Sequence, residues 1–379
     1  MSGPLRVRML RALLYRSAVA TPVRTSFGEM RERPAVFVGV EDEDGVTGWG
    51  EVWCNFPACA AEHRVRLLRT VFAPLLAGAR YDAPADAFDA LSGATAVLAL
   101  QAGEPGPFAQ CIAGIDIALW DLFARRAGKP LWRLLGGTNP ELRVYASGIN
   151  PDAPDRTALE QLARGHRAFK LKVGFGVRRD AANLHAMRDA LGAQALMADA
   201  NQVWSPAEAA ALLPGLEAFD LRWIEEPIRA DESWEQWASL ARATRIPLAA
   251  GENLLGEEAF AQALSVEGLG VVQPDVAKWG GLTHCVPLAR RVLAAGRVFC
   301  PHSLGGGIAL LASAHLLAAA GGAGMLEVDV NPNPLRTLLC GPLAVVREGA
   351  CTLSEAPGLG IEPDFAALER TRGVTSLRL

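Results

Sequence analysis

Residues 196–225 read LMADANQVWSPAEAAALLPGLEAFDLRWIE. One short apolar stretch ends at Asp199, and a second one ends at Glu225. Between them, Ser205-Pro206 precedes an alanine- and leucine-rich stretch, and a serine N-cap followed by a first-turn proline is typical of a helix start. A strand, a helix and a second strand within roughly 30 residues predict one βαβ unit of a parallel sheet.

Ionisable residues recur along the chain at nearly the spacing of this unit. They are Lys172, Asp199, Glu225, Glu252, Asp275, His302 and Glu327, with steps of 27, 26, 27, 23, 27 and 25 residues. Each member can therefore end or follow one strand of a repeating β/α fold. In a (β/α)8 barrel the carboxyl ends of the strands meet at one mouth, where catalytic groups gather. The spacing predicts an α/β barrel with a metal-dependent acid/base site at that mouth.

The regions before and after this repeat follow a different pattern. Residues 1–135 mix strand-like and helix-like segments and predict an α+β domain, whereas residues 136–341 are predicted to form the barrel. The segments of the first domain are 33–40 and Thr47–Val52 as strands, and 61–77 and 108–127 as helices. Residues 342–379 are expected to hold turns and a short strand.

Composition is that of an ordinary globular protein and argues against several classes. Lys and Arg number 37 against 41 Asp and Glu, so no basic face is expected for nucleic acid or anionic membrane. The 7 cysteines are scattered and predict buried thiols in a reducing compartment, with the cytoplasm as the expected location. No apolar stretch of about 18 residues is expected to span a membrane. The Arg-rich start, MSGPLRVRMLRALLYRS, predicts an N-terminal strand rather than a transit peptide.

The acidic residues in the middle of the series form an all-oxygen set. Asp199, Glu225 and Glu252 each end or follow a strand-like run. Carboxylates that face one mouth would repel one another, and a cation relieves that repulsion. Oxygen ligands suit a hard divalent cation, so these residues are predicted to bind one Mg²⁺. The alternative is that they are ordinary surface carboxylates after strands. The near-equal spacing of the three residues argues against that alternative.

Two lysines lie on one strand-like segment, Phe169-Lys-Leu-Lys-Val173. Lys170 and Lys172 are two residues apart, so both point to one face of the strand. That face is expected to be the barrel interior, because a parallel strand is buried on both faces. Adjacent ammonium groups lower each other's pKa, which predicts that one lysine is a neutral base near neutral pH.

The last members of the series predict an imidazole–carboxylate pair. Asp275 beside His302 would orient the ring and raise its basicity. An apolar wall around Glu327 would raise its pKa and keep it protonated. Lys278 competes as an alternative base. The run Gly305-Gly306-Gly307 is a weak candidate for a phosphate cradle; close backbone approach to a substrate, or simply a loop, is favoured.

Several short motifs are shared with one known family. They are Lys170-Leu-Lys172, Asp199-Ala-Asn201-Gln, Trp223-Ile-Glu-Glu-Pro227, Gly251-Glu-Asn-Leu-Leu-Gly256, Gln273-Pro-Asp275 with Lys278-Trp-Gly-Gly281, Pro301-His302-Ser303, and Ile115–Leu122 before Gly136-Gly137. On these motifs, and over nearly its whole length, the chain resembles the enolase superfamily and its mandelate racemase subgroup. The resemblance implies a modified (β/α)7β barrel, a cap made by the N-terminal domain and the C-terminal segment, and a homo-oligomer from dimer to octamer.

The resemblance also implies roles, residue by residue. Asp199, Glu225 and Glu252 become the ligands of one Mg²⁺. Lys172 becomes the base on one face of the α-carbon of a carboxylate substrate, and Lys170 lies beside the substrate carboxylate. The shared step is removal of the α-proton to give an enediolate.

On the opposite face, the resemblance makes His302, paired with Asp275, the second acid/base. Glu327 becomes a hydrogen-bond donor to the carboxylate or enediolate. The sister muconate-lactonising subgroup uses a lysine on the strand of Asp275 and lacks this histidine. Protonation of a β-hydroxyl by His302 would make the protein an acid-sugar dehydratase, the preferred hypothesis. Protonation of the α-carbon would make it a racemase or epimerase.

Substrate choice is expected to depend on the cap loops Thr21–Arg33 and Trp53–His63. The residues predicted to contact the substrate are Arg24, Trp53, Asn55, Asn201 and Lys278. For the cap members of this set, exposed charges and packed aromatic rings are an equally good explanation. A member of the fold that binds an acid without turning it over is disfavoured, because the metal, lysine and histidine positions are all present.

Overall fold

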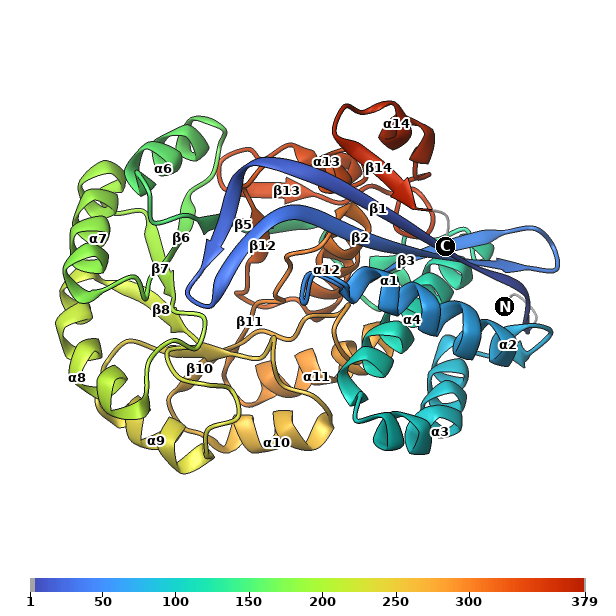
Figure 1. Ribbon diagram of the computed structural model, residues 1–379, viewed down its shortest axis with the longest axis horizontal. Helices are drawn as coiled ribbons and strands as arrows, with labels where there is room; N and C mark the ends of the chain where they lie inside the picture. The colour runs from blue at the N-terminus through green and yellow to red at the C-terminus, as the bar shows by residue number, and fades with distance from the viewer. Residues whose placement is uncertain (1–3, 378–379) are drawn as a thin grey trace.

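The computed structural model describes residues 4–377, and its larger part is a parallel barrel sheet surrounded by helices (Figure 1). The barrel strands are β5 (Glu141–Ile149), β6 (Ala168–Lys172), β7 (Ala195–Asp199), β8 (Leu221–Glu225), β9 (Leu248–Ala250), β10 (Leu269–Val272), β11 (Val298–Phe299) and β12 (Leu326–Asp329). The hydrogen-bonded order is β11-β10-β9-β8-β7-β6-β5-β12. The predicted α/β barrel is confirmed.

One helix separates each barrel strand from the next, which gives the (β/α)7β order. The helices are α6 (Pro154–Ala163), α7 (Val177–Leu191), α8 (Pro206–Leu216, continued by the short 3₁₀ helix η2, Glu217–Phe219), α9 (Trp234–Arg242), α10 (Glu257–Ser265), α11 (Gly281–Ala294) and α12 (Gly307–Ala320). Ser205 caps α8 as predicted, since its side chain accepts a hydrogen bond from the Glu208 N–H. Repetition of one unit therefore places the end of every strand at one mouth.

Alternation along the strands decides which side chains enter the barrel. On β6, Phe169 and Leu171 pack outward in the main core between sheet and helices, whereas Lys170 and Lys172 point inward. Below the mouth, a separate apolar cluster fills the barrel interior; it contains Tyr145, Ala168, Met197, Trp223, Ala249, Val271 and Cys300. The polar residues at the mouth thus lie next to an apolar cluster inside the barrel.

The smaller part of the protein is a cap on an antiparallel sheet. Its strands are β1 (Leu5–Thr25), β2 (Gly28–Asp42), β3 (Thr47–Val52), β4 (Arg80–Tyr81) and β14 (Val374–Leu377), in the order β14-β1-β2-β3 with β4 beside β1. The predicted N-terminal strand is confirmed. The hairpin of β1 and β2 extends from the cap across the barrel (Figure 1), and the Ser26 hydroxyl at its tip donates to the Asn201 carbonyl (3.0 Å).

The cap also contains helices. They are α1 (Ala60–Leu67), the π-helix η1 (Leu68–Phe72), α2 (Ala73–Leu76), α3 (Pro84–Ala102), α4 (Pro105–Arg126) and α5 (Leu131–Leu134). Of these, α1 and α4 contact strands of this sheet. The helices predicted at 61–77 and 108–127 are confirmed, but α3 was missed. Its apolar residues do not keep to one face: Val97, Leu98 and Leu100 are exposed, so the periodicity that marks a surface helix is weak.

The C-terminal segment touches both parts of the protein. It contains α13 (Pro334–Thr337), the 3₁₀ helix η3 (Gly341–Ala344), β13 (Ala350–Thr352), α14 (Phe365–Arg370) and β14. Strand β13 pairs with β5 of the barrel, and β14 pairs with β1 of the cap. The domain boundaries at 135/136 and 341/342 stay a prediction.

Helix α4 has the length and composition of a membrane span, contrary to the expectation from the sequence. Its most apolar window has a mean hydropathy of 1.3. However, 78% of that window is buried inside the protein, where α4 packs on β3, α3 and α11. These contacts are those of a core helix.

A buried carboxylate on α4 connects the cap sheet to the C-terminal segment. The Asp121 side chain accepts hydrogen bonds from the Trp49 and Leu359 N–H groups (2.8 and 2.6 Å) and pairs with Arg125 (2.9 Å). Removal from water raises the pKa of Asp121 from 3.8 to about 6, although Arg125 acts in the opposite direction. Between these two values the folded chain holds a proton that the unfolded chain has lost.

We therefore expect the stabilising contribution of Asp121 to fall as the pH rises through this window and to stay constant above it. The melting temperature of the wild type should fall relative to that of Asp121→Asn between about pH 4 and 6. Thermal denaturation of both proteins across this range measures the difference. A constant offset at every pH would contradict the assignment, and the exposed Asp189→Asn is the control.

Candidate active site at the barrel mouth

The first ion-pair group at the mouth is centred on Lys170. Its ammonium group donates to Glu225 Oε2 (2.6 Å) and contacts Glu327 Oε1 (2.7 Å), and it lies 3.9 Å from Asp199 Oδ2. Lys170 is 1% exposed. Burial disfavours its charge, but the Glu225 and Glu327 carboxylates outweigh burial and hold the pKa of Lys170 well above its usual value.

The second group is centred on Lys172 at the end of β6. Its ammonium group donates to Asp199 Oδ2 (2.5 Å) and to Asn201 Oδ1 (2.8 Å). Asn201 is itself held by Asp199, which accepts from the Asn201 backbone N–H (2.8 Å). Burial again opposes the charge, but Asp199 outweighs it and raises the pKa of Lys172.

The expected net lowering of the lysine pKa values is therefore wrong for this structure, since both values are raised. Lys170 does lower the pKa of Lys172, but the effect is smaller than that of the carboxylates. The reason is that each ammonium group faces its own carboxylate, Glu225 or Asp199, at closer range than it faces the other lysine.

Across the barrel, His302 and Asp275 form the predicted pair. The His302 Nδ1 and Asp275 Oδ2 atoms are 2.7 Å apart, and His302 Nε2 lies 3.4 Å from Glu252 Oε2. Burial disfavours the imidazolium, but Glu252 and then Glu327 and Asp275 outweigh burial and raise the pKa of His302 to about 10. The ring is thus protonated at neutral pH in this arrangement.

Glu327 lies among polar groups rather than against the apolar wall that would keep it protonated. Its carboxylate contacts Lys170, accepts from the Ser303 backbone N–H (3.1 Å), and accepts from the Ser147 hydroxyl. Burial alone would raise its pKa, but Lys170 and His302 outweigh burial and lower the pKa of Glu327. A polar environment therefore keeps this carboxylate ionised.

The three carboxylates predicted as metal ligands lie on consecutive strands but do not enclose a common point. No group of three His, Cys, Asp or Glu side chains within residues 4–377 is gathered closely enough to hold a metal ion. Instead, Asp199 pairs with Lys172, Glu225 with Lys170, and Glu252 with Lys278 (3.1 Å).

The chemistry of this donor set nevertheless fits a hard cation. All three groups are carboxylates, and Glu225 Oε1 is buried without a hydrogen-bond partner. Burial raises the pKa of Glu225 to about 7 despite Lys170, with Asp199 and Glu252 adding to the rise. A buried acceptor that is short of positive charge is suited to coordinate a divalent cation.

Lys278 and the cap residue Trp53 meet at the edge of the mouth. The Lys278 ammonium lies 4.6 Å from the centre of the Trp53 ring and also donates to Asn253 Oδ1 (2.7 Å). The Trp53 ring continues into an aromatic cluster with Phe56 and Phe27 (6.4 and 5.2 Å between successive ring centres). The structure thus brings both predicted substrate contacts to the same edge.

The two other predicted cap contacts are engaged with protein groups. Arg24 pairs with Asp152 beyond the end of β5 (2.5 Å), and its side chain is 40% exposed. The Asn55 amide donates to the Leu304 carbonyl (3.0 Å), two residues after His302. Arg24 therefore lies at the rim, and Asn55 lies against the segment that carries His302.

Sequence reasoning missed three residues that surround the lysines. Ser147 contacts Glu327, Gln273 donates to Glu225 Oε2 (2.8 Å), and Tyr145 lies with its ring 5.3 Å from the Lys170 ammonium. A signal was present for two of them: Tyr145 and Ser147 precede Lys170 and Lys172 by 25 residues, the interval of the series.

Lysine usage is a further signal. The chain has only 4 lysines among its 37 basic residues, and all but Lys129 lie at the mouth. Arginine does not lose its proton in proteins, whereas lysine can. The grouping of the lysines at one site therefore favours a site that transfers protons.

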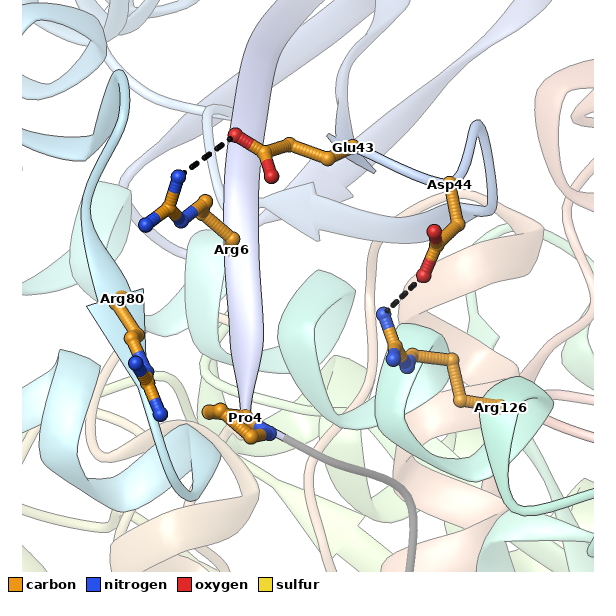
Figure 2. Close-up of a pocket in the computed structure, with 6 residues that line it drawn as sticks. All are labelled: Pro4, Arg6, Glu43, Asp44, Arg80 and Arg126. Atoms are coloured by element: carbon orange, nitrogen blue, oxygen red, sulfur yellow. Dashed lines mark hydrogen bonds and ion pairs between the residues drawn. The ribbon is translucent and has the colours of Figure 1, made fainter.

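A charged hollow elsewhere on the protein does not compete with this site. It lies on the cap and is lined by Arg6, Arg80, Arg126, Glu43 and Asp44 (Figure 2). Arg6 pairs with Glu43 (3.4 Å) and Arg126 with Asp44 (3.1 Å), so much of its charge is already neutralised. No member of the ionisable series lines it.

Comparison with known proteins gives matches over both parts of the chain. The family model "Mandelate racemase / muconate lactonizing enzyme, N-terminal domain" matches residues 10–136, and "Enolase C-terminal domain-like" matches residues 155–367. A D-galactarolactone cycloisomerase from Agrobacterium fabrum is 31% identical over 97% of this chain and 99% of its own.

Two solved structures are similar in fold and sequence. A mandelate racemase/muconate lactonizing enzyme from Bordetella bronchiseptica RB50 has a TM-score of 0.92 and 54% identity over 96% of this chain and 99% of its own. An L-talarate/galactarate dehydratase from Salmonella typhimurium LT2, liganded with Mg and L-lyxarohydroxamate, has a TM-score of 0.84 and 28% identity over 99% of this chain and 95% of its own.

Proposed function

Because the chain belongs to the mandelate racemase/muconate lactonizing enzyme family of the enolase superfamily, we propose that it removes the proton α to the carboxylate of a small acid. The preferred reaction is dehydration of an acid sugar to a 2-keto-3-deoxy acid. The relatives support the acid-sugar substrate class, since their names concern talarate, galactarate and a lactone of galactarate, and the second of them is named a dehydratase.

The observation that carries the proposal is the order of charged groups around the mouth. Asp199 and Glu225 end the neighbouring strands β7 and β8, and Glu252 follows the next strand, β9. Lys172 on β6 flanks them on one side, and His302 after β11 flanks them on the other side. An acid held at the carboxylates through a cation would therefore have one proton-transfer group on each side.

The three carboxylates are proposed to hold one Mg²⁺, the ion named in the dehydratase structure. When bound, Mg²⁺ would act as a Lewis acid that stabilises negative charge on the substrate carboxylate. The ammonium of Lys170, which is 1% exposed, would add a second positive charge beside that carboxylate.

Proton transfer is assigned to the residues that flank the carboxylates. Lys172 takes the α-proton as the neutral amine, and the Asn201 amide oxygen orients its nitrogen. A cation bound at Asp199 would offset the carboxylate charge that raises the pKa of Lys172 and so would favour the neutral amine. His302, which Asp275 orients, donates a proton to the β-hydroxyl; the C–O bond breaks and water leaves. The resulting enol gains a proton at the β-carbon and becomes the 2-keto acid. Each of these transfers lies within the range of general acid–base catalysis, ~10²–10⁴-fold per group.

A racemase or epimerase is the second candidate. The same Lys172 and His302 can remove and return the α-proton from opposite faces, and the solved structure with 54% identity carries the name mandelate racemase/muconate lactonizing enzyme. Cycloisomerisation would use the same proton abstraction with a ring oxygen as the leaving group, as the name of the Agrobacterium relative suggests.

Proton NMR in D₂O with Mg²⁺ and pooled acid sugars, acid-sugar lactones and 2-hydroxy acids tests the proposal. A new signal from the C3 position of a 2-keto-3-deoxy acid is the expected result. Exchange of an α-proton without a new product would show a racemase or epimerase, and conversion of a lactone would show a cycloisomerase. If an acid binds but shows neither α-proton exchange nor a product, the chain would be a protein that binds an acid without turning it over.

A further inference from the structure

We propose that Glu51 of the cap is a positioning residue that holds the segment Pro301–Gly306, and with it His302, in the geometry for proton transfer; the inference rests on the proposed function. Glu51 is the next-to-last residue of β3, lies in its buried part and is 2% exposed. Its carboxylate accepts hydrogen bonds from the Gly306 and Ala309 backbone N–H groups (2.5 and 2.9 Å). These N–H groups lie at the start of α12, directly after the His302 segment.

The glycine run in this segment is shaped for the Glu51 carboxylate. A Cβ atom built on Gly305 or Gly306 would meet a Glu51 carboxylate oxygen at 2.9 Å, which real Cβ contacts do not show. The Gly306 N–H group is therefore taken by Glu51 and is not free to bind a phosphate. The N-terminal turn of α12, which attracts negative charge, is filled by a residue of the cap.

Two more cap residues hold the same segment from the other side. The Leu304 carbonyl accepts hydrogen bonds from the Arg33 guanidinium (3.2 Å) and the Asn55 amide (3.0 Å). Arg33 is 1% exposed and also pairs with Asp329 at the end of β12 (2.8 Å). Within the barrel, the His302 and Ser303 N–H groups donate to Pro274 and Glu327 (both 3.1 Å). Hydrogen bonds thus hold four residues of the segment, namely His302, Ser303, Leu304 and Gly306.

Glu51 is the only charged group of the cap that contacts the start of α12 among the residues described, and no cation is paired with it. Its charge is balanced by backbone N–H groups, so loss of one carboxylate oxygen leaves a buried N–H unpaired. A displacement of about 1 Å at a catalytic group lowers rates severely. Glu51→Gln keeps the size of the side chain but places an amide NH₂ against one of the two donors.

Two reactions of one substrate separate positioning of His302 from general damage to the protein. Lys172 alone can exchange the α-proton for deuterium, whereas elimination also needs His302. The reactions are run in D₂O with Mg²⁺ at about pH 8, above the pKa of about 7 to which burial raises Glu51. NMR measures α-deuterium exchange in the recovered acid and elimination from the amount of product. For a racemase, the readout is the exchange rate of one enantiomer against the other.

For Glu51→Gln we expect the ratio of exchange to elimination to rise at least ~10-fold. In His302→Asn, which lacks the imidazole altogether, the same ratio should rise by ~10²-fold or more. The control Asp121→Asn, another buried cap carboxylate with two backbone N–H partners, should keep the wild-type ratio. A ratio that stays at the wild-type value in Glu51→Gln while both rates fall together would show a merely structural role and overturn the proposal.

Amide hydrogen exchange, read by mass spectrometry on peptides covering 301–310, tests the positioning without any substrate. The Gly306 and Ala309 amides should exchange faster in Glu51→Gln than in the wild type, and at the wild-type rate in Asp121→Asn. Unchanged protection in Glu51→Gln would refute the role of Glu51. If the wild type neither exchanges nor eliminates any acid, the proposed function fails, and these amides still decide whether Glu51 holds the segment.

Discussion

Replacing Lys172 by alanine or arginine is expected to lower kcat by at least ~10²-fold for the acid that the wild type turns over, the usual contribution of a general base. Alanine removes the amine that takes the α-proton. Arginine keeps the positive charge beside Asp199 but does not lose its proton in proteins, so it separates the role of the charge from that of the base. The measurement is kcat for product formation, together with α-deuterium exchange in D₂O.

Two matched variants sharpen this prediction. His302→Asn should lower elimination to a similar extent but leave the α-proton exchange that depends on Lys172. Lys278→Ala removes the competing lysine, whose ammonium contacts Glu252 and the Trp53 ring, and should affect KM more than kcat. Loss of α-proton exchange in Lys278→Ala, with exchange retained in Lys172→Ala, would transfer the role of the base to Lys278.

Removing the divalent cation with a chelator is expected to abolish turnover, and restoring Mg²⁺ should recover it. Binding of Mg²⁺ to the folded protein alone should also raise its melting temperature, since a ligand at about 100 times its Kd stabilises a fold by about 2.7 kcal/mol. Glu225→Gln is expected to lose both effects. The reason is that Glu225 combines a buried, unpartnered oxygen with two neighbouring carboxylates that a cation would bring together.

Isothermal titration calorimetry measures the binding of Mg²⁺, and thermal denaturation with and without Mg²⁺ measures the change in melting temperature. Asp121→Asn is the control, because its buried carboxylate lies on α4 and binds only cap and C-terminal groups. Equal Mg²⁺ binding by the wild type and Glu225→Gln would remove Glu225 from the proposed metal site.

The positions of the chemical groups could be predicted because the repeat carries them. A period of about one βαβ unit places Asp199, Glu225 and the later members at successive strand ends, and the period of two along a strand places Lys170 and Lys172 on one face. Both are properties of local structure. The contact between His302 and Asp275 follows in the same way, since β10 and β11 are neighbours in chain order and in space.

Protonation states could not be predicted in this way. Two lysines on one strand indicated mutual repulsion, yet each lies nearest a carboxylate from another strand, Glu225 for Lys170 and Asp199 for Lys172. The sequence also left the environment of Glu327 open, and only the structure shows that Lys170 and Ser147 contact it. A pKa depends on distances of a few ångströms between side chains from different strands, which no local pattern contains.

The sequence by itself therefore determined the barrel, the ring of charged residues at its mouth, and the family, because these depend on periodicity and on short motifs. Only the tertiary structure decided how the cap acts on the site. Glu51 and the glycine run before α12 are separated by more than 250 positions, and Arg33 and Leu304 by 271. Contacts of that length arise only when two independently patterned domains pack together, so no spacing along the chain indicates them.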